Sequence, residues 1–287
     1  MAAIGRGIRE FGGAVTIHLY TFGWNEMRMI GFFFRHYEPW VDRFIFYDDG
    51  STDGTLELLA SKTNVEIRPF AYTSPDSFSL SVQAWRNSCW KESRGEADWV
   101  IVTDVDEHLH HPALPSYLAR CKDEGVSYIP ALGFDMVTES FPHPEEHLAT
   151  SHTIGAPSAV YSKLRIFDPV AIEEVDYGFG AHSASPRGRL GLPAQDELLL
   201  LHYKHLGTNY VPSRHVALGA RLRKQDLKYN WGAHYLFDDQ RYGQYLADLT
   251  GRLLDVTDAG YLPSRDHRER RWWRPEFGAV VSPTEGR

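Results

Sequence analysis

The feature that most constrains the fold is an alternation of short apolar runs with helix-like stretches through the first hundred residues. The apolar runs predict β-strands at 14–20, 43–47, 65–70 and 98–103. Between them, apolar residues recur at helical spacing, and helices are expected at 25–37, after Asp53 and at 78–92. Alternation at this spacing is typical of βαβ units. We therefore predict an α/β fold, Rossmann-like, with a mainly parallel central sheet and helices on both faces.

Acidic clusters follow three of these predicted strands. Asn25-Glu26, Asp48-Asp49 and the run 104–107 each come directly after or soon after an apolar run. In open α/β sheets the ligand crevice lies outside the carboxyl ends of the strands. We therefore expect the three clusters to converge on one edge of the sheet, although they are far apart in the sequence.

The second half of the chain is less regular. Strands are expected at 127–131, 163–167 and 198–203, and 139–157 is long enough for a binding loop or a lid. Helices are expected at 210–229 and 240–256, whereas the basic aromatic tail from Ser264 matches no clear element. We divide the chain into a catalytic domain, 1–207, and a mainly helical extension, 208–287, packed on the same domain.

Charge and cysteine content exclude several kinds of protein. The 287 residues include 30 Lys and Arg against 38 Asp and Glu, a net charge of −8, which argues against a general nucleic-acid binder but not against an anionic ligand. Only Cys89 and Cys121 are present, so a thiolate metal site is excluded and a reducing compartment is expected. No signal peptide or membrane-spanning stretch is recognisable. These features predict a cytoplasmic protein with at most peripheral membrane contact. The RRWWR tail can contact anionic lipid or a partner, but packing on the domain is preferred.

Asp104-Val105-Asp106 is a candidate metal site. Residues i and i+2 of an extended turn point the same way, so both carboxylates can face one divalent ion. Mg²⁺ and Mn²⁺ prefer oxygen ligands and often bind one or two carboxylates plus substrate phosphates. The alternative is a helix cap or a solvated turn.

The run 48–55, DDGSTDGT, is a second candidate site. It has the composition of a turn between a strand and a helix, with Asp53 as the N-cap. Asp48 and Asp49 need a further explanation, because a carboxylate just past a strand can accept hydrogen bonds from a nucleobase and a ribose.

The segments TFGWNE, FIFYDDGSTDGT and DWVIVTDVDEHL together resemble family 2-type glycosyltransferases of the GT-A fold. The closer likeness is to a bacterial glycosyltransferase 2-like group related to family 92, and it covers 15–109. In that family the strand-end acids bind the nucleotide and the D-x-D motif holds a metal on the diphosphate. The resemblance implies that the donor and its metal contact the following residues: Thr21, Glu26, Asp48, Asp49, Arg86, Asp104 and Asp106, with Asp104 and Asp106 at the metal.

The apolar run ending in HYK supplies a third signal. In metal-dependent GT-A enzymes a histidine beyond the D-x-D often completes the metal site, and His202 resembles it. The alternative is a hydrogen-bonded core histidine. Lys204 would lie on the same side of the strand and neutralise a phosphate oxygen, whereas His205 would point the other way. Basic residues in 214–234 can clamp a diphosphate or simply form a solvated helix face.

The histidines at 108, 110 and 111 lack the spacing of a structural zinc site, and nearby prolines predict a loop there. A zinc site is therefore not expected.

The resemblance implies a metal-dependent transfer of sugar from a nucleoside-diphosphate sugar to a carbohydrate or glycoconjugate acceptor, with Mn²⁺ or Mg²⁺ and inversion by single displacement. The acceptor hydroxyl needs a base, for which the candidates are Asp135, His182 and Asp196; Asp135 is preferred because it would follow a strand to the same edge. The alternatives are a nucleotidyltransferase of similar fold and a non-catalytic nucleotide-sugar-binding protein.

Overall fold

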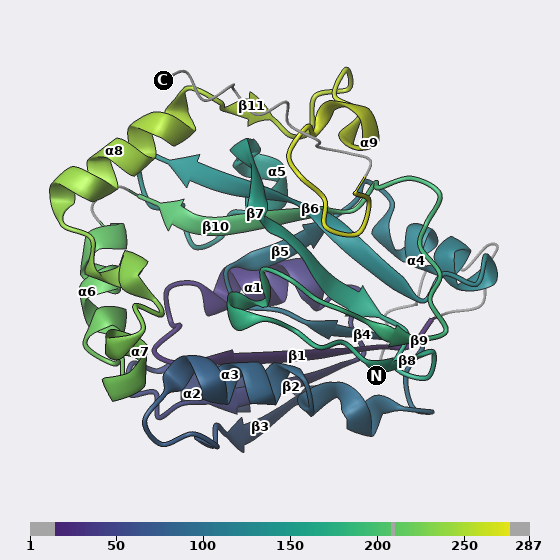
Figure 1. Cartoon of the computed structure of the whole chain (residues 1–287), viewed down its shortest axis with the longest axis horizontal. Helices are drawn as coiled ribbons and strands as arrows, with labels where there is room; N and C mark the ends of the chain where they lie inside the picture. The colour runs from purple at the N-terminus through teal and green to yellow at the C-terminus, as the bar shows by residue number, and fades with distance from the viewer. Residues whose placement is uncertain (1–14, 208–209, 276–287) are drawn as a thin grey trace, which may run out of the picture.

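The computed structural model describes residues 15–207 and 210–275, which form one large sheet flanked by helices (Figure 1). The strand order is β3-β2-β1-β4-β7-β6-β10-β5, and the short strand β11 also pairs with β7. A separate two-stranded sheet pairs β8 (Ile172–Glu174) with β9 (Arg187–Gly188). The chain is thus an α/β protein, as the sequence predicts.

The first half of the chain forms the parallel part of the sheet. The strands β1 (Ile17–Gly23), β2 (Arg43–Asp48), β3 (Val65–Pro69) and β4 (Trp99–Val102) pair in parallel. They are connected through α1 (Ile30–Tyr37), α2 (Thr55–Ala60), and α3 (Phe78–Arg86) followed by the 3-10 helix η1 (Cys89–Ser93). All four strands predicted here are present, so their carboxyl ends lie at one edge.

The second half completes the sheet mostly by antiparallel pairing. Its strands are β5 (Glu107–His110), β6 (Tyr128–Thr138), β7 (Ile154–Phe167), β10 (Leu199–Leu206) and β11 (Leu254–Asp255). β7 is antiparallel to β4, β6 and β11, β5 is antiparallel to β10, and only β6 and β10 pair in parallel. Mainly parallel pairing therefore holds for β3-β2-β1-β4, and the whole sheet is mixed.

The strands β6 and β7 are much longer than the predicted strands 127–131 and 163–167. They extend toward the intervening segment, which contains the short helix α5 (Leu148–Ser151). Gly133 makes this pairing possible, because a Cβ atom there would lie 2.1 Å from the carbonyl carbon of Tyr161. The predicted loop 139–157 therefore includes the beginning of β7. The expected loop at the histidines is also wrong, because His108 and His110 lie in β5.

Helices cover both faces of the sheet. Because neighbouring residues of a strand point to opposite faces, they contribute to two different hydrophobic cores. Leu19 belongs to the core beneath α1, where Phe33 and Phe34 pack against Phe44. Tyr20 belongs to the second core, beneath α3 and η1. The helix α4 (Leu114–Asp123) adds Leu114, Tyr117 and Leu118 to the first of these cores.

The last part of the chain contains α6 (Tyr210–Gly219), α7 (Lys224–Lys228), η3 (Ala233–Leu236), α8 (Asp239–Thr250) and α9 (Pro263–Asp266). The predicted helix 210–229 is thus two helices, because α6 ends at Gly219. The strand β11 shows that this part is not purely helical. The boundary at 207/208 stays a prediction. No helix in the described ranges is long and apolar enough to cross a membrane.

Candidate functional site

The acidic clusters lie at the carboxyl ends of β1, β2 and β4, which are neighbours in the sheet. Glu26 follows β1, Asp49 follows β2, and Asp104 and Asp106 follow β4. Because parallel strands end at the same edge of a sheet, these clusters lie along one edge. The helices α6 and α7 lie beside this edge (Figure 1).

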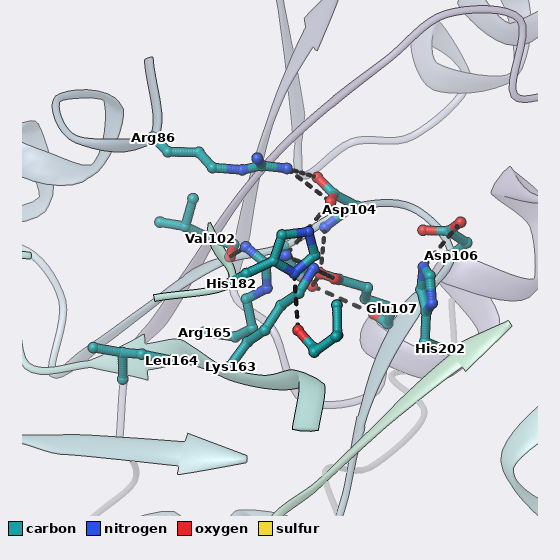
Figure 2. A network of polar contacts seen from close by, with 12 residues as sticks. Arg86, Val102, Asp104, Asp106, Glu107, Lys163, Leu164, Arg165, His182 and His202 are labelled. Atoms are coloured by element: carbon teal, nitrogen blue, oxygen red, sulfur yellow. Dashed lines mark hydrogen bonds and ion pairs between the residues drawn. The ribbon is translucent and has the colours of Figure 1, made fainter. Parts of the chain in front are cut away.

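A buried ionic network holds the turn after β4 (Figure 2). The Glu107 side chain is 0% exposed, and its carboxylate accepts from Lys163 Nζ at 2.9 Å and from an Arg165 Nη at 2.7 Å. It also accepts from the backbone N–H of Asp104 at 3.2 Å and the Thr103 hydroxyl at 3.1 Å. Because these partners come from the turn after β4 and from β7, Glu107 ties the turn to the sheet.

Asp104 faces arginines on the other side of this network. Arg86, at the end of α3, donates to both carboxylate oxygens at 2.5 and 2.7 Å, and Arg165 lies 3.4 Å away. The predicted contact between Arg86 and the nucleotide-sugar is thus replaced here by a contact with Asp104. Both oxygens of Asp104 are occupied by guanidinium groups rather than directed at Asp106.

Asp106 and His202 form the pair that the sequence predicts. His202 Nε2 lies 3.5 Å from a carboxylate oxygen of Asp106 (Figure 2). β10 runs antiparallel to β5, so His202 is opposite Glu107, and the N–H of Tyr203 donates to the Asp106 carbonyl at 2.7 Å. The strand register therefore brings the imidazole to the D-x-D turn.

Asp106 and His202 stabilise each other's charged forms. Burial lowers the pKa of His202, but the carboxylates of Asp106 and Asp135 outweigh it and raise that pKa to about 9. Burial raises the pKa of Asp106, but the attraction of His202 leaves it below its usual value. Lys204 follows on the same strand, and burial lowers its pKa to about 8 against the attraction of Asp106.

The three predicted metal ligands do not form one group. Among the described residues, no cluster of three or more His, Cys, Asp or Glu side chains is arranged to hold a metal. Asp106 is 33% exposed and shares its position with an imidazole nitrogen, so these two side chains suit a cation that takes its other ligands from phosphate and water. Asp104 does not join them in this structure.

The preferred base, Asp135, lies in β6 at the same edge but is covered. It is 2% exposed, and its carboxylate lies between His202 Nδ1 at 3.6 Å and His205 Nε2 at 3.7 Å. Tyr245 donates to its other oxygen at 3.3 Å. Asp135 is therefore covered by other side chains in this structure, and its role as the base stays a prediction.

The other two candidate bases lie in different surroundings. Asp196 is 1% exposed and is bound by Arg271 at 2.7 Å, by Trp273 Nε1 at 3.0 Å and by Arg274 at 3.0 Å. Because all three partners belong to the C-terminal segment, Asp196 anchors that segment to the start of β10, and its catalytic role stays a prediction. His182 is exposed, lies beside the network of Figure 2, and its Nδ1 is 2.8 Å from the Val160 carbonyl.

The carboxyl ends of β1 and β2 are contacted by arginines of the α6–α7 segment. Arg214 binds the Glu26 carboxylate and the backbone carbonyls of Trp24 and Asn25. Arg221 donates to an Asp49 carboxylate oxygen at 2.5 Å and lies over the Trp24 ring at 4.0 Å.

The other residues predicted to contact a nucleotide have different surroundings. Asp49 also accepts from Tyr72 Oη at 2.7 Å. The Asp48 carboxylate accepts from the N–H groups of Gly50 at 2.9 Å and Ser51 at 3.0 Å, so it stabilises its own turn. Thr21 is 0% exposed within β1. Burial raises the pKa of Glu26 to about 7 although Arg214 opposes it.

The sequence motifs do not identify three residues of this network: Glu107, Lys163 and Arg165. The sequence does contain an indication of this network, because Lys163 and Arg165 alternate with apolar residues in a run that predicts a strand. Two cations on one face of a buried strand require a buried anion. His205 lies on the same side as His202, contrary to the prediction, because the pairing of β10 with β6 shifts register between these two residues. This irregularity turns both imidazoles toward Asp135.

No family model matches the chain, and no curated protein matches its sequence. Among solved structures, it is similar to S. aureus TarS 1-349 in complex with UDP, at 15% identity and a TM-score of 0.36, over 54% of this chain and 47% of that chain. It is also similar to glucosyl-3-phosphoglycerate synthase from Mycobacterium tuberculosis in complex with Mn²⁺, UDP and glucosyl-3-phosphoglycerate, at 23% identity and a TM-score of 0.28, over 42% and 44%. The chain spans less than half the length of each. Likenesses this low carry no argument about its activity.

Proposed function

We propose that this protein is a GT-A-type glycosyltransferase that transfers a sugar from a nucleoside-diphosphate donor to an acceptor hydroxyl. The observation that carries the proposal is the meeting of Asp106 and His202, from distant parts of the sequence, at the edge that also holds Glu26 and Asp49. The motif resemblance of 15–109 to family 2-type enzymes supports the same assignment.

Two of this chain's residues would hold a divalent cation, Mn²⁺ or Mg²⁺. The Asp106 carboxylate is ionised near neutral pH, since its pKa is lowered. The His202 imidazole, whose pKa is raised to about 9, would release a proton to solvent when its Nε2 binds the cation. Such a cation neutralises the charge that develops on a leaving diphosphate. Lys204 and the network around Asp104 supply further charge at the same place.

The nucleoside would lie along β1 and β2. Asp49 has a carboxylate that can accept from a base or a ribose hydroxyl, as the motif resemblance implies. In the present structure Arg221 and Tyr72 occupy that carboxylate. Donor binding would therefore exchange the contact between Arg221 and Asp49 for contacts with the nucleotide, and it would leave a guanidinium beside the diphosphate.

We propose inversion by a single displacement, as the motif resemblance implies. Of the three candidate bases only His182 is exposed, so it is the one able to meet an acceptor hydroxyl without rearrangement. A His182→Asn variant would lower the rate of transfer and leave donor binding unchanged. Weaker donor binding in that variant would argue against a role for His182 as the base.

Release of nucleoside diphosphate from a panel of nucleotide sugars, measured with Mn²⁺ and a mixture of sugar acceptors, tests the proposed function. The wild-type protein should release nucleoside diphosphate rather than pyrophosphate, and Asp106→Asn should lose at least about 100-fold in rate. Asp123→Asn, a neutralisation of an exposed carboxylate at the end of α4, is the matched control and should be unaffected. Equal rates in Asp106→Asn and the wild type would refute the proposal.

A further inference from the structure

Three buried polar atoms converge beneath the proposed cation site. His202 Nδ1 and His205 Nε2 lie 3.6 and 3.7 Å from the same oxygen of Asp135, Oδ1. None of the three has a hydrogen-bond partner within the part of the chain that the structure describes. Unpaired buried polar atoms are costly, so three of them facing one another need an explanation.

The strand pairing of β10 brings these three atoms together. β10 pairs with β5 on one side and β6 on the other, and His202 is opposite Glu107 in β5 and Asp135 in β6. The register shift that follows His202 adds a residue, so that His205 comes to the same carboxylate. A regular strand would have placed the imidazoles of His202 and His205 on opposite faces.

The carboxylate is held from its other side as well. Tyr245 of α8 donates to Asp135 Oδ2 at 3.3 Å, and Tyr242 of the same helix is 3.1 Å from His205 Nδ1. The ring of Tyr161 packs on His202, with centroids 4.0 Å apart. Asp135 is thus fixed in position and shielded from solvent, so it can act on a ligand only through a neighbouring side chain.

We propose that Asp135 is a positioning residue that orients the His202 imidazole, so that Nδ1 faces Asp135 and Nε2 is presented to the divalent cation beside Asp106. The inference rests on the proposed function. The 3.6 Å separation is longer than a hydrogen bond, and a small movement of the imidazole when a cation binds would close it. A carboxylate on the second nitrogen of a ligating histidine fixes the tautomer and strengthens the ligand.

The test is a double-mutant cycle on Mn²⁺ affinity, with Mn²⁺ alone as the probe and free Mn²⁺ measured by electron paramagnetic resonance. Asp135→Asn should weaken Mn²⁺ binding by about 10- to 100-fold, the usual effect of losing such a partner. In a His202→Ala background the same substitution should change nothing further, because Asp135 acts through His202. Asp123→Asn, which neutralises an exposed carboxylate at the end of α4 and touches none of these side chains, is the matched control; it should keep the wild-type affinity.

The outcomes separate the two proposals. Wild-type protein that binds no Mn²⁺ up to millimolar concentration, both alone and with UDP present, would overturn the metal-dependent function and this inference with it. Wild-type binding that Asp135→Asn leaves unchanged, or weakens equally in the presence and absence of His202, would overturn the positioning role alone. If Asp135→Asn does not fold, Asp135→Ser, which leaves room for a water beside the imidazoles, replaces it in the same cycle with the same expectations.

Discussion

Replacing Glu107 by Gln should strongly destabilise the protein, because Glu107 compensates two buried cations. Its carboxylate contacts Lys163 and Arg165, whose side chains are 3% and 0% exposed. The substitution keeps the size and shape of the side chain but removes the negative charge. Arg86, Lys163 and Arg165 would then share the single carboxylate of Asp104, which already binds Arg86.

The cost follows from the burial of these charges. Breaking a buried ion pair by neutralising one partner typically costs about 3–5 kcal/mol, since the other charge stays buried without compensation. Deprotonation of Lys163 would reduce part of this cost. Burial already lowers its pKa against the attraction of Glu107, and loss of that attraction lowers the pKa further. The folded variant would then hold fewer protons than the unfolded chain below the usual lysine pKa, so its stability rises with pH.

Urea denaturation at pH 7 and pH 9 measures both effects. Glu107→Gln should lose about 3–5 kcal/mol of unfolding free energy at pH 7, and the deficit should shrink by about 1 kcal/mol or more at pH 9. Glu174→Gln is the matched control, because its pair with Lys91 has side chains 33% and 34% exposed and should contribute less than about 1 kcal/mol. A loss below about 1 kcal/mol in Glu107→Gln would refute the account of this network.

Three further predictions concern parts of the fold outside that network. Asp196→Asn should free the C-terminal segment and cost about 3–5 kcal/mol, because Asp196 is buried beneath Arg271; limited proteolysis that still spares this segment would contradict the anchor role. Asp226→Asn should cost about 1–3 kcal/mol and speed amide exchange at the start of α3, where Asp226 accepts from the N–H groups of Phe78 and Ser79; unchanged exchange there would count against it. Burial lowers the pKa of His36 to about 3, so the folded state resists a proton that the unfolded chain accepts below the usual pKa of 6.5, and stability should fall as pH falls between these values. His36→Phe should reduce the loss between pH 6.5 and 5 by about 2 kcal/mol in urea denaturation, and an identical pH profile in both proteins would disprove this.

The parallel half of the fold could be predicted from sequence because its signals are local. Each of its strands is a compact apolar run, and each turn carries acidic or glycine residues, as in 48–55. Parallel pairing then places Glu26, Asp49 and Asp106 at one edge without any knowledge of side-chain contacts. The motif resemblance predicts His202 as a metal ligand beside the D-x-D motif; the structure places its Nε2 3.5 Å from Asp106, and the ligand role stays a prediction.

The remainder depends on pairings between distant segments, which leave little local trace. The antiparallel path through β7 depends on close strand approach at Gly133. The register shift in β10 moves His205 to the side of Asp135, and a strict alternation of side chains predicts the opposite. Asp196 could not be told apart from a catalytic acid, because its partners Arg271 and Arg274 come from the far end of the chain.

Nucleoside diphosphate binding measured by calorimetry, with and without Mn²⁺, tests the central claim most directly. For at least one of UDP, GDP, ADP and CDP, the wild-type protein should bind with an affinity that Mn²⁺ raises at least about tenfold. Asp106→Asn should lose that increase while Asp123→Asn retains it. Binding that is the same with and without Mn²⁺, or the same in Asp106→Asn as in the wild type, would contradict the account.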